Sequence, residues 1–212
     1  MASKLSVYNA ALAECGERKL SALTENREPR RVLDSVWDND FLKACLSEAL
    51  WNHAIRTVEL TYSPSVSPDF GYPRAFDKPE DWVRTAALCS DDRFTVPLLR
   101  YKDEAGYWFA ELDTIYVSYV SDDVEYGLDL SLWPAKFTEF VETKLAAKSA
   151  KRITGSDSEA MRIEKLAKDR LKSARSVDAM NDPTKLMPPG TWSQSRMGRG
   201  RRDGGNRGSL IG

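Results

Sequence analysis

The fold of this chain depends most on residues 133–180, which read WPAKFTEFVETKLAAKSAKRITGSDSEAMRIEKLAKDRLKSARSVDAM. Apolar side chains recur at helical spacing on both sides of a short break at residues 153–156. In that break, Gly155 is a natural helix stop because glycine reaches the left-handed conformation without a steric penalty. Ser156 then begins a capping-box pattern that ends at Glu159. The stretch predicts two amphipathic helices joined by a short turn and therefore antiparallel.

The apolar stripes of these helices are typical of ordinary core packing. The first helix carries Phe137, Phe140, Val141 and Leu145, and the second carries Ile163, Leu166, Ala167, Leu171, Ala174 and Val177. Pro134 stands in the first turn of the first helix, where a proline loses no hydrogen bond. Neither helix buries its stripe alone, so we expect the pair to pack on other parts of the chain.

The composition is that of a globular protein. The chain has 212 residues, of which 42% are hydrophobic and 30% charged, enough for one domain or two small ones. Its three cysteines are far apart in sequence, and we expect reduced, mostly buried thiols. The N-terminus lacks the apolar run of a signal peptide, and no segment approaches the length of a membrane span. These features predict a protein made in the cytoplasm, with no membrane partner.

The rest of the chain alternates between helical and strand patterns. Residues 5–15 predict a short helix that stops at Gly16, and residues 29–50 predict a longer helix at the centre of a bundle. Period-two alternation then predicts a small antiparallel sheet, with strands near residues 58–62, 83–89, 94–101, 107–112 and 115–120, and residues 102–106 as a hairpin connection.

The predicted fold class is α+β. Residues 1–54 and 126–180 would form a bundle of three or four helices, with a β region inserted at residues 55–125. An extended basic arm rich in glycine and arginine would follow at residues 181–212.

The sequence carries few signs of catalytic chemistry. His53 is the only histidine and stands beside a tryptophan, which favours a packed or capping role over catalysis. The acid pairs at 91–92 and 122–123 fit solvated turns better than a weak cation site. Phosphate-binding glycine motifs and the nucleophile-elbow motif are absent. We therefore expect a protein that is not an enzyme, with no cofactor and no metal.

Charge is distributed unevenly along the chain. From Gly190 to the end, five arginines and one aspartate give +4, while the other 26 basic and 31 acidic residues give −5. The arginines are Arg196, Arg199, Arg201, Arg202 and Arg207. They favour either phosphate binding or, together with Trp192, insertion into a groove of a partner protein; a plain solubilising tail is the third interpretation.

Several short stretches, in the same order, resemble the head-to-tail adaptor proteins of tailed phages, the family that includes the tail tubular protein A of short-tailed phages. The opening helix ends at Cys15-Gly16-Glu17, where the family has Ile-Gly-Glu, and is followed by Leu20-Ser21-Ala22-Leu23. The other matching positions are Trp51 and Asn52, Pro79 in Pro79-Glu80-Asp81-Trp82, Trp133 and Pro134, Gly155 in its turn, and Trp192 with Arg196. The Gly/Arg-rich arm and Cys15 depart from the family pattern.

The resemblance implies a structural virion protein at the head–tail junction. Copies, twelve in the family, would form a ring beneath the portal protein, carry the tail tube or nozzle protein, and let genomic DNA pass through the lumen without specific binding. Trp192 and the five arginines of the arm would contact the portal. The alternative is a small nucleic-acid-binding or packaging accessory protein that acts through the same arm.

Overall fold

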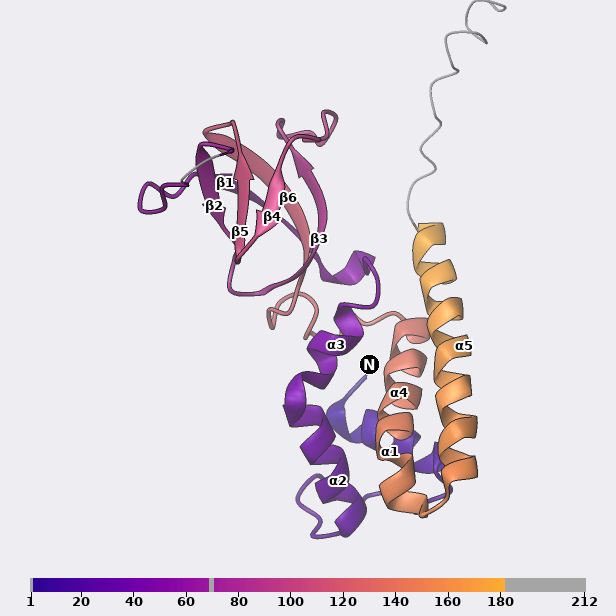
Figure 1. Ribbon diagram of the computed structural model, residues 1–212. Helices are drawn as coiled ribbons and strands as arrows, with labels where there is room; N and C mark the ends of the chain where they lie inside the picture. The colour runs from indigo at the N-terminus through magenta and orange to yellow at the C-terminus, as the bar shows by residue number, and fades with distance from the viewer. Residues whose placement is uncertain (1, 69–70, 182–212) are drawn as a thin grey trace, which may run out of the picture. The chain divides into compact units, whose positions relative to one another are not determined.

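The computed structural model describes residues 2–68 and 71–181 and confirms the predicted α+β class (Figure 1). Helices come from both ends of the described chain, and the strands lie between them. The helices are α1 (Lys4–Glu14), α2 (Glu28–Val36), α3 (Leu42–Leu46), α4 (Ala135–Thr154) and α5 (Asp157–Asn181). The strands are β1 (Ile55–Thr61), β2 (Arg74–Asp77), β3 (Trp82–Cys89), β4 (Lys102–Glu104), β5 (Tyr107–Ala110) and β6 (Thr114–Ser121).

Helices α4 and α5 form the antiparallel hairpin that their sequence predicts. Gly155 has a φ of +67° and caps α4, its amide donating to the Lys151 carbonyl oxygen. Ser156 accepts the Glu159 amide at 3.4 Å, so half of the capping box forms. The predicted stripe of α4 is buried, as are Ile163, Ala167 and Ala174 of α5. Helix α4 is central, because α1, α2 and α5 all pack on it.

The structure differs from the helix predicted at residues 29–50 in two respects. This helix does not lie at the centre of the bundle, and it does not run unbroken. A π-helical turn, η1 (Trp37–Phe41), separates α2 from α3, with Asp40 at φ +50°. The Asn39 side chain donates to the Ser35 carbonyl oxygen at 2.8 Å, offering the backbone an alternative to helical bonding. Helix α3 ends at Leu46, and a 3-10 turn, η2 (Asn52–Ala54), leads into β1.

The β region contains two three-stranded antiparallel sheets, not the single sheet predicted. Their strand orders are β1-β6-β3 and β2-β5-β4. Strand β2 was not predicted. Residues 102–104, predicted as part of a connection, form β4, which joins β5 through a tight turn where Ala105 and Gly106 both have positive φ. Residues 94–101 form no strand beyond an isolated bridge between Cys89 and Pro97.

Two apolar cores form, one among the helices and one in the β region. The helical core includes Phe137, Phe140, Leu145 and Ile163. The β core, which receives side chains from both sheets, includes Phe76, Leu88, Trp108, Ala110, Ile115, Val117 and Tyr119. Strands β3 and β6 serve both cores, because Val83 and Val120 belong to the helical one. The cysteines are buried as predicted at positions 45 and 89, and Cys15 is half-buried.

Candidate functional site

The predicted portal-binding residues lie outside the described part of the chain. Trp192 and the arginines at 196, 199, 201, 202 and 207 all follow Asn181, the last residue that the structure describes. The other motif residues are described, and the structure places them at junctions between elements.

Trp51 and Asn52 join the start of the β region to the end of α5. Trp51 is buried, packs edge-on against Phe137 at 4.8 Å between ring centroids, and donates its indole N–H to the Cys45 carbonyl oxygen at 3.2 Å. The Asn52 amide donates to an Asp178 carboxylate oxygen at 3.1 Å, and its Nδ2 donates to the Asp178 carbonyl oxygen at 2.9 Å. These bonds hold the last turn of α5, immediately before the arm begins, against the body.

His53 is packed against aromatic rings, in line with the packed role predicted for it. Its ring lies 4.6 Å from that of Phe137 and 6.4 Å from that of Trp51, between centroids. Neither imidazole nitrogen has a hydrogen-bond partner among residues 2–68 and 71–181. Burial lowers the pKa of His53 to about 4, so the ring is neutral near pH 7.

Trp133 and Pro134 hold the start of α4. Pro134 is the N-cap residue of α4, and Trp133 packs edge-on against Phe137 at 5.1 Å. The Trp133 indole donates at 2.9 Å to the carbonyl oxygen of Gly127, in a tightly packed loop. A Cβ at position 127 would lie 2.3 Å from the Ser121 carbonyl oxygen and 2.8 Å from a Leu46 methyl carbon. Only glycine fits there without movement.

Gly16 and Pro79 also lie at element ends. Gly16 has a φ of +73° and donates to the Ala13 carbonyl oxygen just after α1. Pro79 precedes β3, and its carbonyl oxygen accepts the Trp82 amide at 3.0 Å.

Next to Pro79, the structure reveals a polar cluster around Asp81 that sequence reasoning missed. The Asp81 carboxylate accepts from Arg56 at 2.9 Å, from the Tyr119 hydroxyl at 3.0 Å and from Ser121. Burial alone would raise the pKa of Asp81, but these hydrogen bonds outweigh it and lower the pKa below its ordinary value. The partners come from β1 and β6, so no local pattern could have found them. The cluster ties three segments of the β region together.

The acid pairs have structural partners that fit the turn interpretation. Asp91 accepts the amides of Thr95 and Val96 at 3.0 and 2.8 Å. Asp122 pairs with Lys43 at 2.9 Å. Among the described residues, no group of three or more His, Cys, Asp or Glu side chains is placed to hold a metal ion.

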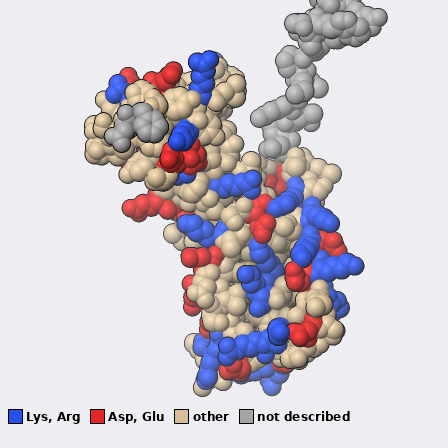
Figure 2. Space-filling model, viewed as in Figure 1, with Lys and Arg blue, Asp and Glu red and all other residues tan. Residues whose placement is uncertain are grey.

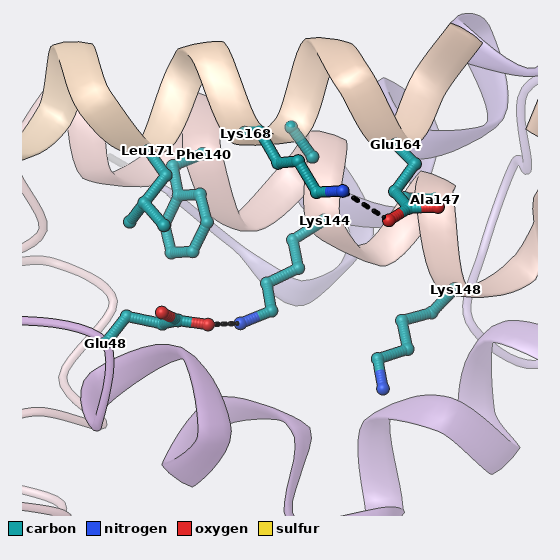
Figure 3. A pocket seen from close by; sticks show the side chains of 9 residues that line it. Glu48, Phe140, Lys144, Ala147, Lys148, Glu164, Lys168 and Leu171 are labelled. Atoms are coloured by element: carbon teal, nitrogen blue, oxygen red, sulfur yellow. Dashed lines mark hydrogen bonds and ion pairs between the residues drawn. The ribbon is translucent and has the colours of Figure 1, made fainter. Parts of the chain in front are cut away.

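The structure also shows a groove of about 340 Å³ over α4 and α5 that the sequence did not predict, here named the α4–α5 groove (Figure 3). Its apolar lining consists of Phe140, Ala147, Ala167 and Leu171. Its charged lining consists of Glu48, Lys144, Lys148, Glu164 and Lys168. A second hollow of about 260 Å³, beside η1, shares Lys148 with the groove. The α4 stripe predicted core packing, but it could not show that one part of α4 stays uncovered.

The lysines of the groove differ in their pairing. Lys144 pairs with Glu48 at 2.7 Å and Lys168 pairs with Glu164 at 2.8 Å, as the dashed lines in Figure 3 mark. Lys148 is exposed and forms no ion pair with the described part of the chain. Figure 2 shows Lys and Arg side chains spread over the same face of the bundle, with acidic side chains between them. The groove therefore offers an apolar floor and one unneutralised cation.

No protein-family model matches the sequence, and a search of curated proteins gives no significant match. Within residues 2–68 and 71–181, none of the helices combines the length and apolar character needed to cross a bilayer.

Proposed function

We propose that this protein is a head-to-tail adaptor of a tailed phage, a structural virion component whose copies form a ring between the portal protein and the tail tube or nozzle. The observation that carries the proposal is the ordered series of family-like motifs along the chain. The structure supports it indirectly. Trp51, Asn52 and Trp133, three of the residues that carry the resemblance, hold the junctions between the helical bundle, the β region and the end of α5.

The firmly held end of α5 supports a portal-docking role for the residues that follow it in the sequence. Asn52 anchors α5 at Asp178, three residues before the helix ends at Asn181. An arm that leaves a fixed point can reach a partner without disturbing the body. Docking would then depend on Trp192 and the arginines, because buried aromatic and guanidinium groups supply most of the binding energy in many interfaces.

The β region offers a surface for the next component of the tail. Residues 90–101 carry apolar side chains that the β core does not cover: Val96 is 54% exposed and Leu99 is 85% exposed. Asp91 braces this segment through the Thr95 and Val96 amides. A braced, exposed apolar segment is suited to contact the tube or nozzle protein.

The net charge fits passage of DNA through a ring. The chain up to residue 189 carries −5, which would repel the phosphate backbone from the lumen wall instead of binding it. The genome would then slide during ejection. If acids that face the lumen are replaced by lysine, we expect ejection to slow.

The decisive experiment mixes the full-length protein with the portal protein of the same phage and counts bound copies by native mass measurement. We expect a monomer alone and a ring of twelve copies on the portal. A variant truncated after residue 189 should keep the circular dichroism and melting temperature of the full chain but fail to bind.

The alternative function, nucleic-acid binding through the arm, predicts a different result. The full-length protein would then retard DNA at low salt and release it steeply as salt rises, because phosphate contacts release counterions. Loss of this retardation on truncation, with no portal complex from the full chain, would replace the adaptor proposal with the alternative.

A further inference from the structure

The α4–α5 groove has one unpaired lysine among the described residues, whereas the segment at residues 122–132, here named the acidic loop, carries only acidic charges. From Asp103 to Ala135, with both ends included, the chain carries eight acidic residues and no lysine or arginine. Four of the eight lie in the acidic loop: Asp122, Asp123, Glu125 and Asp129. Asp122 pairs with Lys43 and Asp123 lies 3.8 Å from Arg56, whereas Glu125 and Asp129 form no ion pair within the described residues. The groove carries three lysines and two glutamates around an apolar floor, and Lys144 and Lys168 pair with the glutamates, which leaves Lys148 as the lysine without an ion pair among the described residues. The two surfaces share no residue, so one copy could present both at once.

The acidic loop is braced from inside. Its Asp123 carbonyl oxygen accepts the amides of Tyr126 and Leu128, both at 3.1 Å. Gly127 is packed against the Ser121 backbone and held by the Trp133 indole. A loop that is already ordered loses little conformational entropy when it binds.

The same loop presents an apolar side chain next to an acidic one. Val124 is 75% exposed, and Glu125 beside it is also exposed. The groove offers the matching pair: the apolar surface of Ala147 and Leu171, and the unpaired ammonium group of Lys148. If Val124 of one copy lay on the apolar floor of another copy's groove, Glu125 would lie toward the rim of that groove. At the rim the carboxylate would keep part of its hydration. Both partners of the contact are therefore provided by this chain.

We infer that the α4–α5 groove of one copy receives the acidic loop of a neighbouring copy. Such a contact joins two different surfaces, so it is heterologous, and a rotation that closes turns it into a ring. The inference rests on the proposed adaptor function, because it names the contact between neighbours in the proposed ring. A helix of the portal in the groove is the competing occupant, and the experiment separates the two.

The test traps the contact between two full-length variants, both in a Cys15→Ala background. One carries Ala147→Cys in the groove and the other carries Val124→Cys in the loop; both changes keep the charges. Mild oxidation of the mixture, with the portal protein present to assemble the ring, should give several-fold more disulfide-linked heterodimer than a control mixture in which Ser173→Cys replaces Ala147→Cys. Ser173 is exposed on α5 but does not line the groove. Yields equal to the control would overturn the inference.

A charge swap then separates a direct contact from a structural effect. Adding Lys148→Glu to the groove variant, or Glu125→Lys to the loop variant, should lower the heterodimer yield toward the control. Combining both changes should restore it, because the ion pair re-forms with its charges exchanged. Failure of the combination to recover, with both variants folded by circular dichroism, would also overturn the inference.

The outcomes remain distinguishable from those of the adaptor proposal. If rings form on the portal but the cysteines introduced at positions 147 and 124 of neighbouring copies are not linked in them, the groove contact is wrong and the adaptor function stands. A link from the groove to the portal would identify the competing occupant. If the heterodimer forms in solution but the portal is ignored, the contact stands and the adaptor function fails.

Discussion

The helical core and the β core both contain fully buried aromatic side chains. In the helical core these side chains are close in sequence, whereas in the β core they are far apart. Phe137 and Phe140 lie one turn apart in α4. Phe76 in β2 and Trp108 in β5 are register partners on two neighbouring antiparallel strands. The first core depends on local periodicity, whereas the second depends on strand pairing. Strands β3 and β6 contribute to both, so we expect the stability of one core to depend on the other.

The largest expected effect tests that dependence. Phe140→Ala in the helical core and Phe76→Ala in the β core should each lower the free energy of unfolding by about 3–5 kcal/mol, because each leaves a cavity. If the shared strands couple the cores, each variant will show one denaturant transition, at the same midpoint by circular dichroism and by tryptophan fluorescence. A fluorescence transition that shifts alone in Phe76→Ala would instead show two independent cores.

The next effect concerns His53, at the boundary between the two regions. Its pKa of about 4 in the folded protein lies below the ordinary 6.5, so the unfolded chain binds a proton more readily between these values. Stability should therefore fall by roughly 3 kcal/mol as pH drops through this window. Burial raises the pKa of Glu142 to about 6, which acts in the opposite direction.

The comparison with His53→Phe isolates the histidine. Relative to the wild type, this variant should gain stability as pH is lowered from about 7 to about 4, measured by urea unfolding at each pH. Parallel stability curves for the two proteins would show that His53 does not titrate in this way.

A smaller effect is expected at the packed glycine of the acidic loop. Gly127→Ala should cost about 2 kcal/mol because the new methyl group meets the Ser121 backbone and Leu46. Gly155→Ala should cost about 1 kcal/mol, because its site is open and only the positive φ is strained. If guanidinium unfolding gave equal losses of stability for the two variants, the acidic loop would be able to move and accommodate the methyl group at position 127.

The smallest effect is expected at the hydrogen bond between η2 and α5. Asn52→Ala removes the side-chain donor to the Asp178 carbonyl oxygen and should cost about 1 kcal/mol. Hydrogen exchange near the end of α5 should also become faster. Asn39→Ala, which removes an exposed bond from η1 to α2, serves as the control and should leave that exchange unchanged.

The sequence alone was enough to predict what local spacing and backbone preference control. The α4–α5 hairpin, its Gly155 turn, the burial of the α4 stripe and the α+β class follow from periodicity and from glycine's freedom to adopt a positive φ. The sequence singled out Trp51 and Trp133 as motif residues, but it could not predict their hydrogen bonds to the carbonyl oxygens of Cys45 and Gly127.

Tertiary structure decided what depends on residues that meet from distant parts of the chain. It split the β region into two sheets, added β2, broke the predicted helix at Asp40 and assembled the Asp81 cluster. It also left the α4–α5 groove open beside Lys148. A periodic pattern reports that a face is apolar, but whether another element covers that face depends on the whole packing arrangement.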